Sequence, residues 1–313
     1  MPLENAVAAK VRHPVLTSKL TPPRLRNILT RPRLIKLARL KEKRLLTICA
    51  GPGYGKTTLM AQLAELHQGP KVWYQVDNFD RDPAVFLRHL ITGISDACNG
   101  IGNRSLVRLS EATNIETEAE SILAVLIDEM REGLERPLML CIDDFHILES
   151  AEIASNLFNL IIEHQPENNV IILASRNGLS LHVGRMRSHG LIEEISEDDL
   201  RFTNQESIEL LCDMWNLSDN NKILERLLKS TEGWVTGLVL AESYLRSGAS
   251  RFPDLFNQKV LQRNIYEYLA EEVLDQQTSH LQLFLMKCSL LEFIDPEICK
   301  AVFEAKYWIY YIS

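Results

Sequence analysis

The sequence has no long hydrophobic run. None of its apolar stretches approaches the roughly 18 residues that are needed to cross a bilayer. Its first residues, MPLENAVAAKVRHP, hold no apolar segment of the kind found in a secretory signal. We therefore expect a cytoplasmic protein with no membrane partner.

Closely spaced cysteines and histidines are also missing. The six cysteines are scattered along the chain, and none forms the close pair that a zinc site or a redox motif requires. The eight histidines include no HExxH and no cluster with the spacing of metal ligands. The sequence thus predicts buried free thiols and histidines that are structural or face solvent.

Basic residues are scarce outside one segment. The range 24–44 contains nine Lys and Arg against the single acid Glu42, which makes it +8, and subtracting this from the net charge of −8 leaves −16 for the rest. The basic segment either attracts the phosphates of a nucleotide or is a solvated helix face. The acidic remainder argues against a broad nucleic-acid surface.

What is present is an alternation of strand and helix patterns. Four segments are strand candidates: 45–50, 71–76, 137–144 and 169–176. The last two are continuous apolar runs that end in charged residues, as is typical of strands buried on both faces of a parallel sheet. Helical patterns lie between them, at 84–97 and near 117–132 and 151–164. This alternation predicts an α/β domain that binds its ligand beyond the carboxyl ends of the strands.

After about residue 203 the strand pattern fades. Three helical patterns near 204–215, 219–230 and 234–247 indicate a small helical domain. A break at 247–254 precedes further helical patterns near 260–274, 280–290 and 296–303. A chain of 313 residues is long enough for two or three domains of this kind.

The most specific local motif is AGPGYGKTT at 50–58, which fits the P-loop pattern except that Ala50 stands at its first glycine position. Glycines let such a loop curl so that main-chain N–H groups face phosphates, and the next helix adds the positive end of its dipole. We expect Lys56 to reach the β- and γ-phosphates of ATP. The predicted nucleotide contacts are Gly51, Pro52, Gly53, Tyr54, Gly55, Lys56, Thr57 and Thr58. The alternative is a glycine turn without a ligand.

Two acids and an arginine follow the predicted strands. Asp143 closes the third apolar run, where a P-loop protein needs a carboxylate to hold Mg²⁺ together with the hydroxyl of Thr57. Asp144 suits a general base that polarises the attacking water, or it caps the following helix. Arg176 ends the fourth run and either senses the γ-phosphate or forms a surface ion pair. The catalytic candidates are Lys56, Asp144 and Arg176, and the metal candidates are Thr57 and Asp143.

Eight ordered segments resemble the signal-transduction ATPases with numerous domains and, within them, the MalT-type bacterial transcription regulators. They span nearly the whole chain: LTSKLTPPR, RPRLIKL, GPGYGKTTL, FDRDPAVFLRHLI, LCIDDFH, ILASRN, TEGWVTGL and YEYLAEEVLD. An ordered set of this kind is far more specific than a P-loop alone.

The resemblance implies the fold and further contacts. The strand that ends at Arg176 would lie between the P-loop strand and the strand that ends at Asp143, in an AAA-like P-loop ATPase. Leu29 and Arg31 would contact the adenine base and the ribose. The implied divisions are an adenine-side segment at 1–44, the ATPase core at 45–202, a helical domain at 203–256 and an incomplete winged-helix domain at 257–313. In related ATPases a glycine-x-proline element of the helical domain touches the nucleotide, whereas the corresponding GWVTG has no proline, so Trp234 is equally a core residue.

The function that the resemblance implies is a switch. ADP would hold the chain closed, while ATP would favour a form able to self-associate, with slow hydrolysis as the reset. DNA contact is expected only through a C-terminal domain that these residues do not include. The alternatives are a catalytic P-loop ATPase with its own acceptor substrate, and a DNA-directed ATPase or loader of the AAA type.

Overall fold

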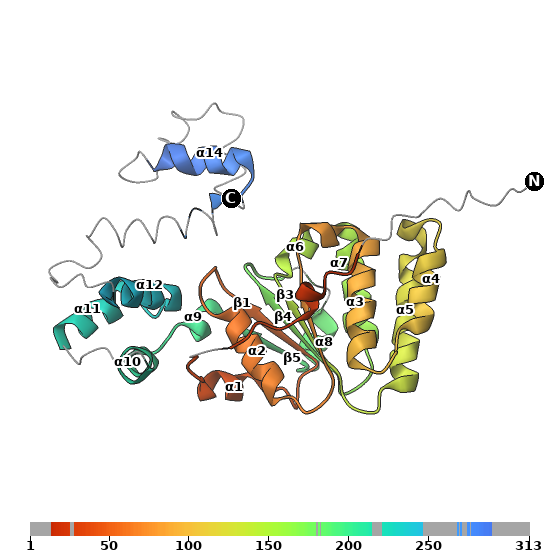
Figure 1. Cartoon of the computed structure of the whole chain (residues 1–313), viewed down its shortest axis with the longest axis horizontal. Helices are drawn as coiled ribbons and strands as arrows, with labels where there is room; N and C mark the ends of the chain where they lie inside the picture. The colour runs from red at the N-terminus through yellow and green to blue at the C-terminus, as the bar shows by residue number, and fades with distance from the viewer. Residues whose placement is uncertain are drawn as a thin grey trace, which may run out of the picture. The chain divides into compact units, whose positions relative to one another are not determined.

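The computed structural model describes residues 14–25, 28–179, 181, 183–214, 221–246, 268, 270, 274–275 and 277–289. Figure 1 shows its helices and strands in chain order. They are η1 (Thr17–Leu20), α1 (Pro32–Ala38), β1 (Leu45–Cys49), α2 (Lys56–Leu66), β2 (Lys71–Gln75), η2 (Asn78–Arg81), α3 (Pro83–Ala97), α4 (Asn103–Glu111), α5 (Ile115–Gly133), β3 (Met139–Asp143), α6 (His146–Glu149), α7 (Glu152–His164), β4 (Val170–Ser175), α8 (Gly184–Ser188), β5 (Ile192–Ile195), α9 (Glu197–Leu200), α10 (Asn204–Ile208), the π-helical η3 (Glu209–Met214), α11 (Asn221–Thr231), α12 (Val235–Arg246) and α14 (Ser279–Cys288).

The described residues fall into two compact units. One lies within Met1–Asn220 and includes Glu232–Val235, and the other lies within Asn221–Thr231 and Thr236–Ser313. The first unit holds the sheet, and the second holds α11, most of α12 and α14. In the second unit α11 buries Leu227, and α12 buries Leu238 and Ala241.

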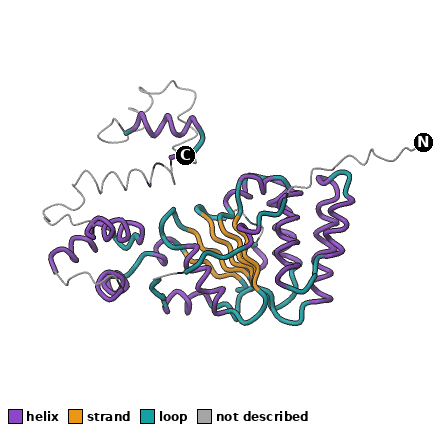
Figure 2. Tube along the Cα trace, in the orientation of Figure 1, coloured by secondary structure: helices purple, strands orange, loops and turns teal. Residues whose placement is uncertain are grey.

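A five-stranded parallel sheet in the order β2-β3-β4-β1-β5 forms the centre of the first unit (Figure 2). In the register of β1, Leu45 lies opposite Ile171 of β4 on one side and Ile192 of β5 on the other. Strand β4 therefore lies between β1 and β3, so the sheet that the resemblance implied is confirmed. Because the strands are parallel, the ends of β1, β3 and β4 meet at one edge.

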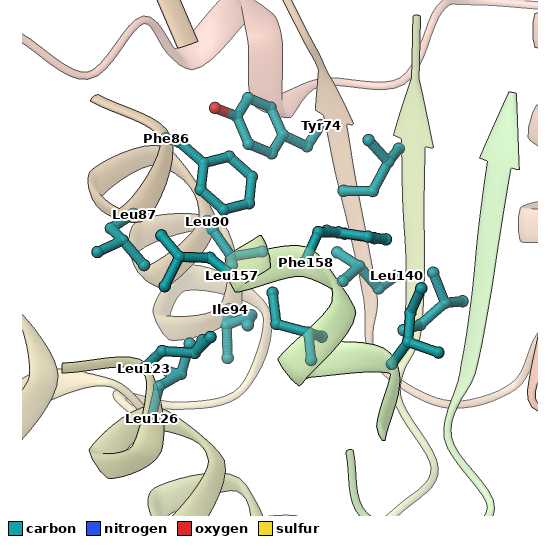
Figure 3. Close-up of a cluster of buried hydrophobic side chains, with 14 of the residues drawn as sticks. Tyr74, Phe86, Leu87, Leu90, Ile94, Leu123, Leu126, Leu140, Leu157 and Phe158 are labelled. Atoms are coloured by element: carbon teal, nitrogen blue, oxygen red, sulfur yellow. The ribbon is translucent and has the colours of Figure 1, made fainter. Parts of the chain in front are cut away.

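Alternate side chains of each strand enter two separate cores. On one face, residues such as Leu140 and Ile171 join the apolar sides of α3, α5 and α7 in the cluster of Figure 3. On the other face, residues such as Cys141 and Ile172 pack with α1 and α2. Burial on both faces explains why these strands read as continuous apolar runs.

The structure also differs from the sequence-based expectations. Strand β5 was not predicted because its IEEI has two acids and only two apolar residues, which suits an edge strand. The pattern at 204–215 is a short α-helix followed by a π-helical turn. Most of the helix predicted near 260–274 and all of the helix predicted near 296–303 lie outside the described residues, as does most of the predicted winged-helix domain, which stays a prediction. None of the helices in the described part of the chain is both long and apolar enough to cross a membrane.

The basic segment at 24–44 contains α1. Leu34 and Ala38 of this helix are fully buried, while the side chains of Arg33, Lys36 and Arg39 are exposed. Lys36 and Arg39 thus fit the solvated helix face that the sequence offered as one of two interpretations, whereas Arg33 also pairs with Glu206 and Arg31 is buried.

Candidate nucleotide-binding site

The loop between β1 and α2 is shaped by two glycines. Gly53 and Gly55 have φ angles of 77° and 83°, in the left-handed region that side chains rarely adopt. Gly55 is the N-cap residue of α2, an 11-residue helix whose first turn has main-chain N–H groups without an intrahelical acceptor. The loop and the helix N-terminus together therefore form a place suited to an anion.

Lys56 is the first residue of α2 and is almost buried, with 8% of its surface exposed. Its Nζ atom donates a hydrogen bond to the main-chain oxygen of Gly51 at 2.8 Å. Burial lowers the pKa of this ammonium, and the nearby charges of Asp143 and Asp144 oppose that shift. No carboxylate of the described residues comes within 4.0 Å of its nitrogen. Its positive charge thus lacks a direct ionic partner within the described fold.

Asp143 and Thr57 lie in contact, although 86 residues separate them in the sequence. The Thr57 hydroxyl donates to Oδ2 of Asp143 at 2.7 Å. Asp143 ends β3 and is 2% exposed. Burial and the neighbouring charge of Asp144 raise the pKa of Asp143 to about 6, against the effect of its hydrogen bonds. One hydroxyl and one buried carboxylate, side by side at the foot of α2, fit two ligand positions of Mg²⁺, whose others would be phosphate oxygens and waters.

Asp144 occupies an unusual backbone conformation, with φ of 55°. Its N–H donates to Oδ1 of Asp143 at 3.0 Å, which fixes the two acids relative to each other. The N-cap residue of α6 is Phe145, and that helix end has no side-chain cap hydrogen bond. The interpretation of Asp144 as the helix cap is therefore wrong, while its role as a general base stays a prediction.

Arg176 directly follows β4, between the ends of β1 and β3. Burial is the main cause that lowers the pKa of both Lys56 and His146, and the positive charge of Arg176 adds to both shifts. The arginine is thus electrically part of the same site as Lys56. Its contact with a γ-phosphate stays a prediction.

The predicted adenine-side residues are held by other parts of the protein. Leu29 is 6% exposed, and its main-chain oxygen accepts a hydrogen bond from Gln62 of α2 at 2.9 Å. The guanidinium of Arg31 donates to both carboxylate oxygens of Glu206, each at 3.2 Å, and stacks 4.2 Å from the ring centre of Phe202. The base and ribose contacts of Leu29 and Arg31 stay predictions. In this structure Arg31 donates its hydrogen bonds to Glu206 of α10 and to the main-chain oxygen of Arg201 before that helix.

Comparison with known proteins identifies the relatives of this chain. A model of the AAA domain matches residues 38–181. The HTH-type transcriptional regulator MalT of Yersinia enterocolitica is 32% identical over 289 residues, covering 88% of this chain and 31% of the relative. MalT of Yersinia pestis matches with the same identity and coverage. The chain is a homologue of the MalT-type regulators. It spans about a third of the length of the MalT proteins that it matches.

Two solved structures are also similar at a distance. The replication initiator DnaA bound to AMPPCP and single-stranded DNA overlaps with a TM-score of 0.43 and 17% identity, covering 88% of this chain and 82% of that one. The Orc1 protein of Aeropyrum pernix in complex with DNA overlaps with a TM-score of 0.43 and 16% identity, covering 83% and 71%.

Three residues near the P-loop of this MalT homologue were not predicted as site residues. Burial and the charges of Arg176 and Lys56 lower the pKa of His146, while the charge of Asp144 opposes this shift. Its buried Nδ1 atom has no hydrogen-bond partner in the described part of the chain. Glu197 and Trp234 contact the loop itself. His146 and Trp234 stand in the LCIDDFH and TEGWVTGL segments, which carried the resemblance, whereas no motif pointed to Glu197.

Proposed function

We propose that this chain is the nucleotide-binding module of a MalT-type transcription regulator and that it binds ATP or ADP with Mg²⁺. The observation that carries the proposal is the 2.7 Å contact between the Thr57 hydroxyl and the Asp143 carboxylate beside a glycine loop. This contact supports the proposal because it puts a hydroxyl and a carboxylate, two ligands suited to Mg²⁺, next to a helix end suited to an anion, and a nucleoside triphosphate with Mg²⁺ requires both.

Each residue of the site has a distinct task in this proposal. The main-chain N–H groups of the loop and of the first turn of α2 bind phosphate oxygens, and Thr58 adds its hydroxyl. Lys56 contributes its unpaired charge to the β- and γ-phosphates. Thr57 and Asp143 hold Mg²⁺, which when bound neutralises charge that develops on the phosphates. Asp144 orients and polarises the attacking water, and Arg176 contacts the γ-phosphate.

The biological role we propose is a switch with slow hydrolysis. A ligand shifts a conformational equilibrium only by its differential affinity for the two forms. Here the γ-phosphate is the group that differs, and in this proposal Arg176 and Asp144 are the residues that contact it. ATP would favour a self-associating form and ADP a closed form, while DNA contact would belong to parts of such a regulator outside these 313 residues.

The switch is tested by comparing the mass of the 313-residue chain in solution with MgATP and with MgADP. We expect larger assemblies with MgATP, and hydrolysis far slower than the roughly 10 s⁻¹ that is typical of enzymes. A rapid turnover by the monomer, or strong stimulation of hydrolysis by DNA, would contradict the switch and favour a catalytic or DNA-directed ATPase.

A further inference from the structure

The P-loop is hydrogen-bonded to α9 through Glu197. Oε2 of Glu197 accepts a hydrogen bond from the N–H of Gly51 at 3.0 Å, and Oε1 accepts one from Arg201 at 3.2 Å. The guanidinium of Arg201 lies 5.5 Å from the centre of the Tyr54 ring. Glu197 thus connects the first glycine of the loop, Gly51, to the segment that follows β5.

A second tie comes from the turn before α12. The indole Nε1 of Trp234 donates to the main-chain oxygen of Pro52 at 3.2 Å, across 182 residues of sequence. The turn itself is fixed by a hydrogen bond from the N–H of Phe202 to the oxygen of Gly233 at 2.9 Å. Gly233 has φ of 78°, and a Cβ atom there would lie 2.4 Å from the Phe202 oxygen, so a side chain does not fit. The indole is therefore presented to the loop by a rigid turn.

The turn that holds Trp234 is flanked in the sequence by residues of the second unit. Glu232–Val235 belongs to the compact unit of the sheet, whereas α11 before it and the rest of α12 after it belong to the second unit. The turn that bonds to Pro52 thus lies, along the chain, between two segments of the second unit.

We infer that Trp234 and Glu197 form a latch on the P-loop, defined by their hydrogen bonds to Pro52 and Gly51, and that this latch sets how long nucleotide is retained. The inference rests on the proposed nucleotide binding. The two side chains bond to the main-chain oxygen of Pro52 and to the N–H of Gly51, and they leave the amides of residues 54–57 for phosphate. Holding the outer end preorganises those amides, which strengthens binding because less freedom is lost when the ligand arrives. Trp234 is a positioning residue in this account, since it acts through the loop.

The experiment compares Trp234→Phe with a matched control in the 313-residue chain. Trp73 is a buried tryptophan of β2 whose indole N–H has no hydrogen-bond partner in the described residues, and Trp73→Phe removes that N–H. In the nucleotide-free protein, we expect amide hydrogen exchange in a peptide covering 50–58 to be about three- to tenfold faster in Trp234→Phe, the effect of one hydrogen bond. Trp73→Phe should leave that peptide unchanged.

Nucleotide supplies two further readouts. The dissociation rate of a fluorescent ADP analogue should rise by about three- to tenfold in Trp234→Phe and stay unchanged in Trp73→Phe. A change of tryptophan emission on addition of MgADP should persist in Trp73→Phe and disappear in Trp234→Phe, which a purely structural role of the indole would not produce.

The second tie is tested with two substitutions at Glu197. Glu197→Ala should accelerate exchange at residues 50–58, whereas Glu197→Gln keeps an oxygen that accepts from Gly51 and should restore slow exchange. If the exchange in Trp234→Phe and in Glu197→Ala equals that of the wild type, the latch is refuted. Absence of ADP binding by the wild type would instead refute the proposed function, and the exchange measured without nucleotide would still decide whether the latch exists.

Discussion

Two buried lysines of this protein lie near pairs of aspartates, and their charges are used differently. Lys19, in η1, is 7% exposed, and its Nζ contacts Asp80 at 2.5 Å and Asp77 at 2.9 Å. Lys56 is 8% exposed, but its Nζ bonds to the uncharged oxygen of Gly51. The charge of Lys19 is neutralised by the fold, whereas that of Lys56 is left for another anion.

Whether a buried charge has an ionic partner distinguishes residues that stabilise the fold from residues that are suited to bind a ligand. A buried charge is expensive unless it is paired, so a charge without an ionic partner has to be explained by something the fold does not contain. At the end of β1 we propose that this is a nucleotide phosphate. Arg31 belongs with Lys19 in this respect, because Glu206 neutralises it.

The largest effect is expected for Lys19→Ala. Removal of one partner leaves the fully buried Asp80 without its cation, so the free energy of unfolding should fall by about 3–5 kcal/mol. Denaturant unfolding measures this loss, with Lys36→Ala on the exposed face of α1 as the control that should change little. If Lys19→Ala unfolds with the same free energy as the wild type, the pairing of Lys19 with Asp77 and Asp80 does not stabilise the fold.

A smaller effect, on binding rather than folding, is expected for Lys56→Ala. The affinity for MgATP should fall by about 100-fold, the upper range for hydrogen bonds to a charged group. The free energy of unfolding without nucleotide should change by no more than about 1 kcal/mol, because only the hydrogen bond to Gly51 is lost and no ionic partner. Titration with a fluorescent ATP analogue checks the first statement and denaturant unfolding the second; a mutant that keeps the wild-type affinity would show that the loop is not the site.

The smallest effect is expected for Glu206→Gln, and it depends on pH. Burial pushes the pKa of Glu206 up, but the hydrogen bonds from Arg31 and Arg33 outweigh it and hold the pKa below its usual value. The stabilisation is therefore present above the unfolded pKa of about 4.3 and is lost as the pH falls through the lower folded pKa. Glu206→Gln should be less stable than the wild type by about 1–2 kcal/mol at pH 7. The difference should shrink below pH of about 4; a difference that does not change with pH would mean that the ionised pair is not its source.

Local patterns predicted the central strands and much of the site. The runs ending at Asp143 and Arg176 are apolar because both faces of the sheet are covered, and a parallel sheet then brings their ends to the P-loop. The contacts of Arg31 with Glu206 and of Trp234 with Pro52 could not be predicted in the same way. Each joins residues more than 170 positions apart and depends on how the segments after β5 fold back, for which the sequence has no periodic signal.

The central claim is that Thr57 and Asp143 complete an anion-binding loop as a site for Mg²⁺ and nucleotide. Its most direct test is an equilibrium titration of the 313-residue chain with ATP, once with Mg²⁺ and once with EDTA. The account predicts saturable binding of one ATP per chain that is tighter with Mg²⁺, and a loss of this difference in Asp143→Asn. Absence of saturable binding under both conditions, or equal affinity with and without Mg²⁺ in the wild type, would contradict it.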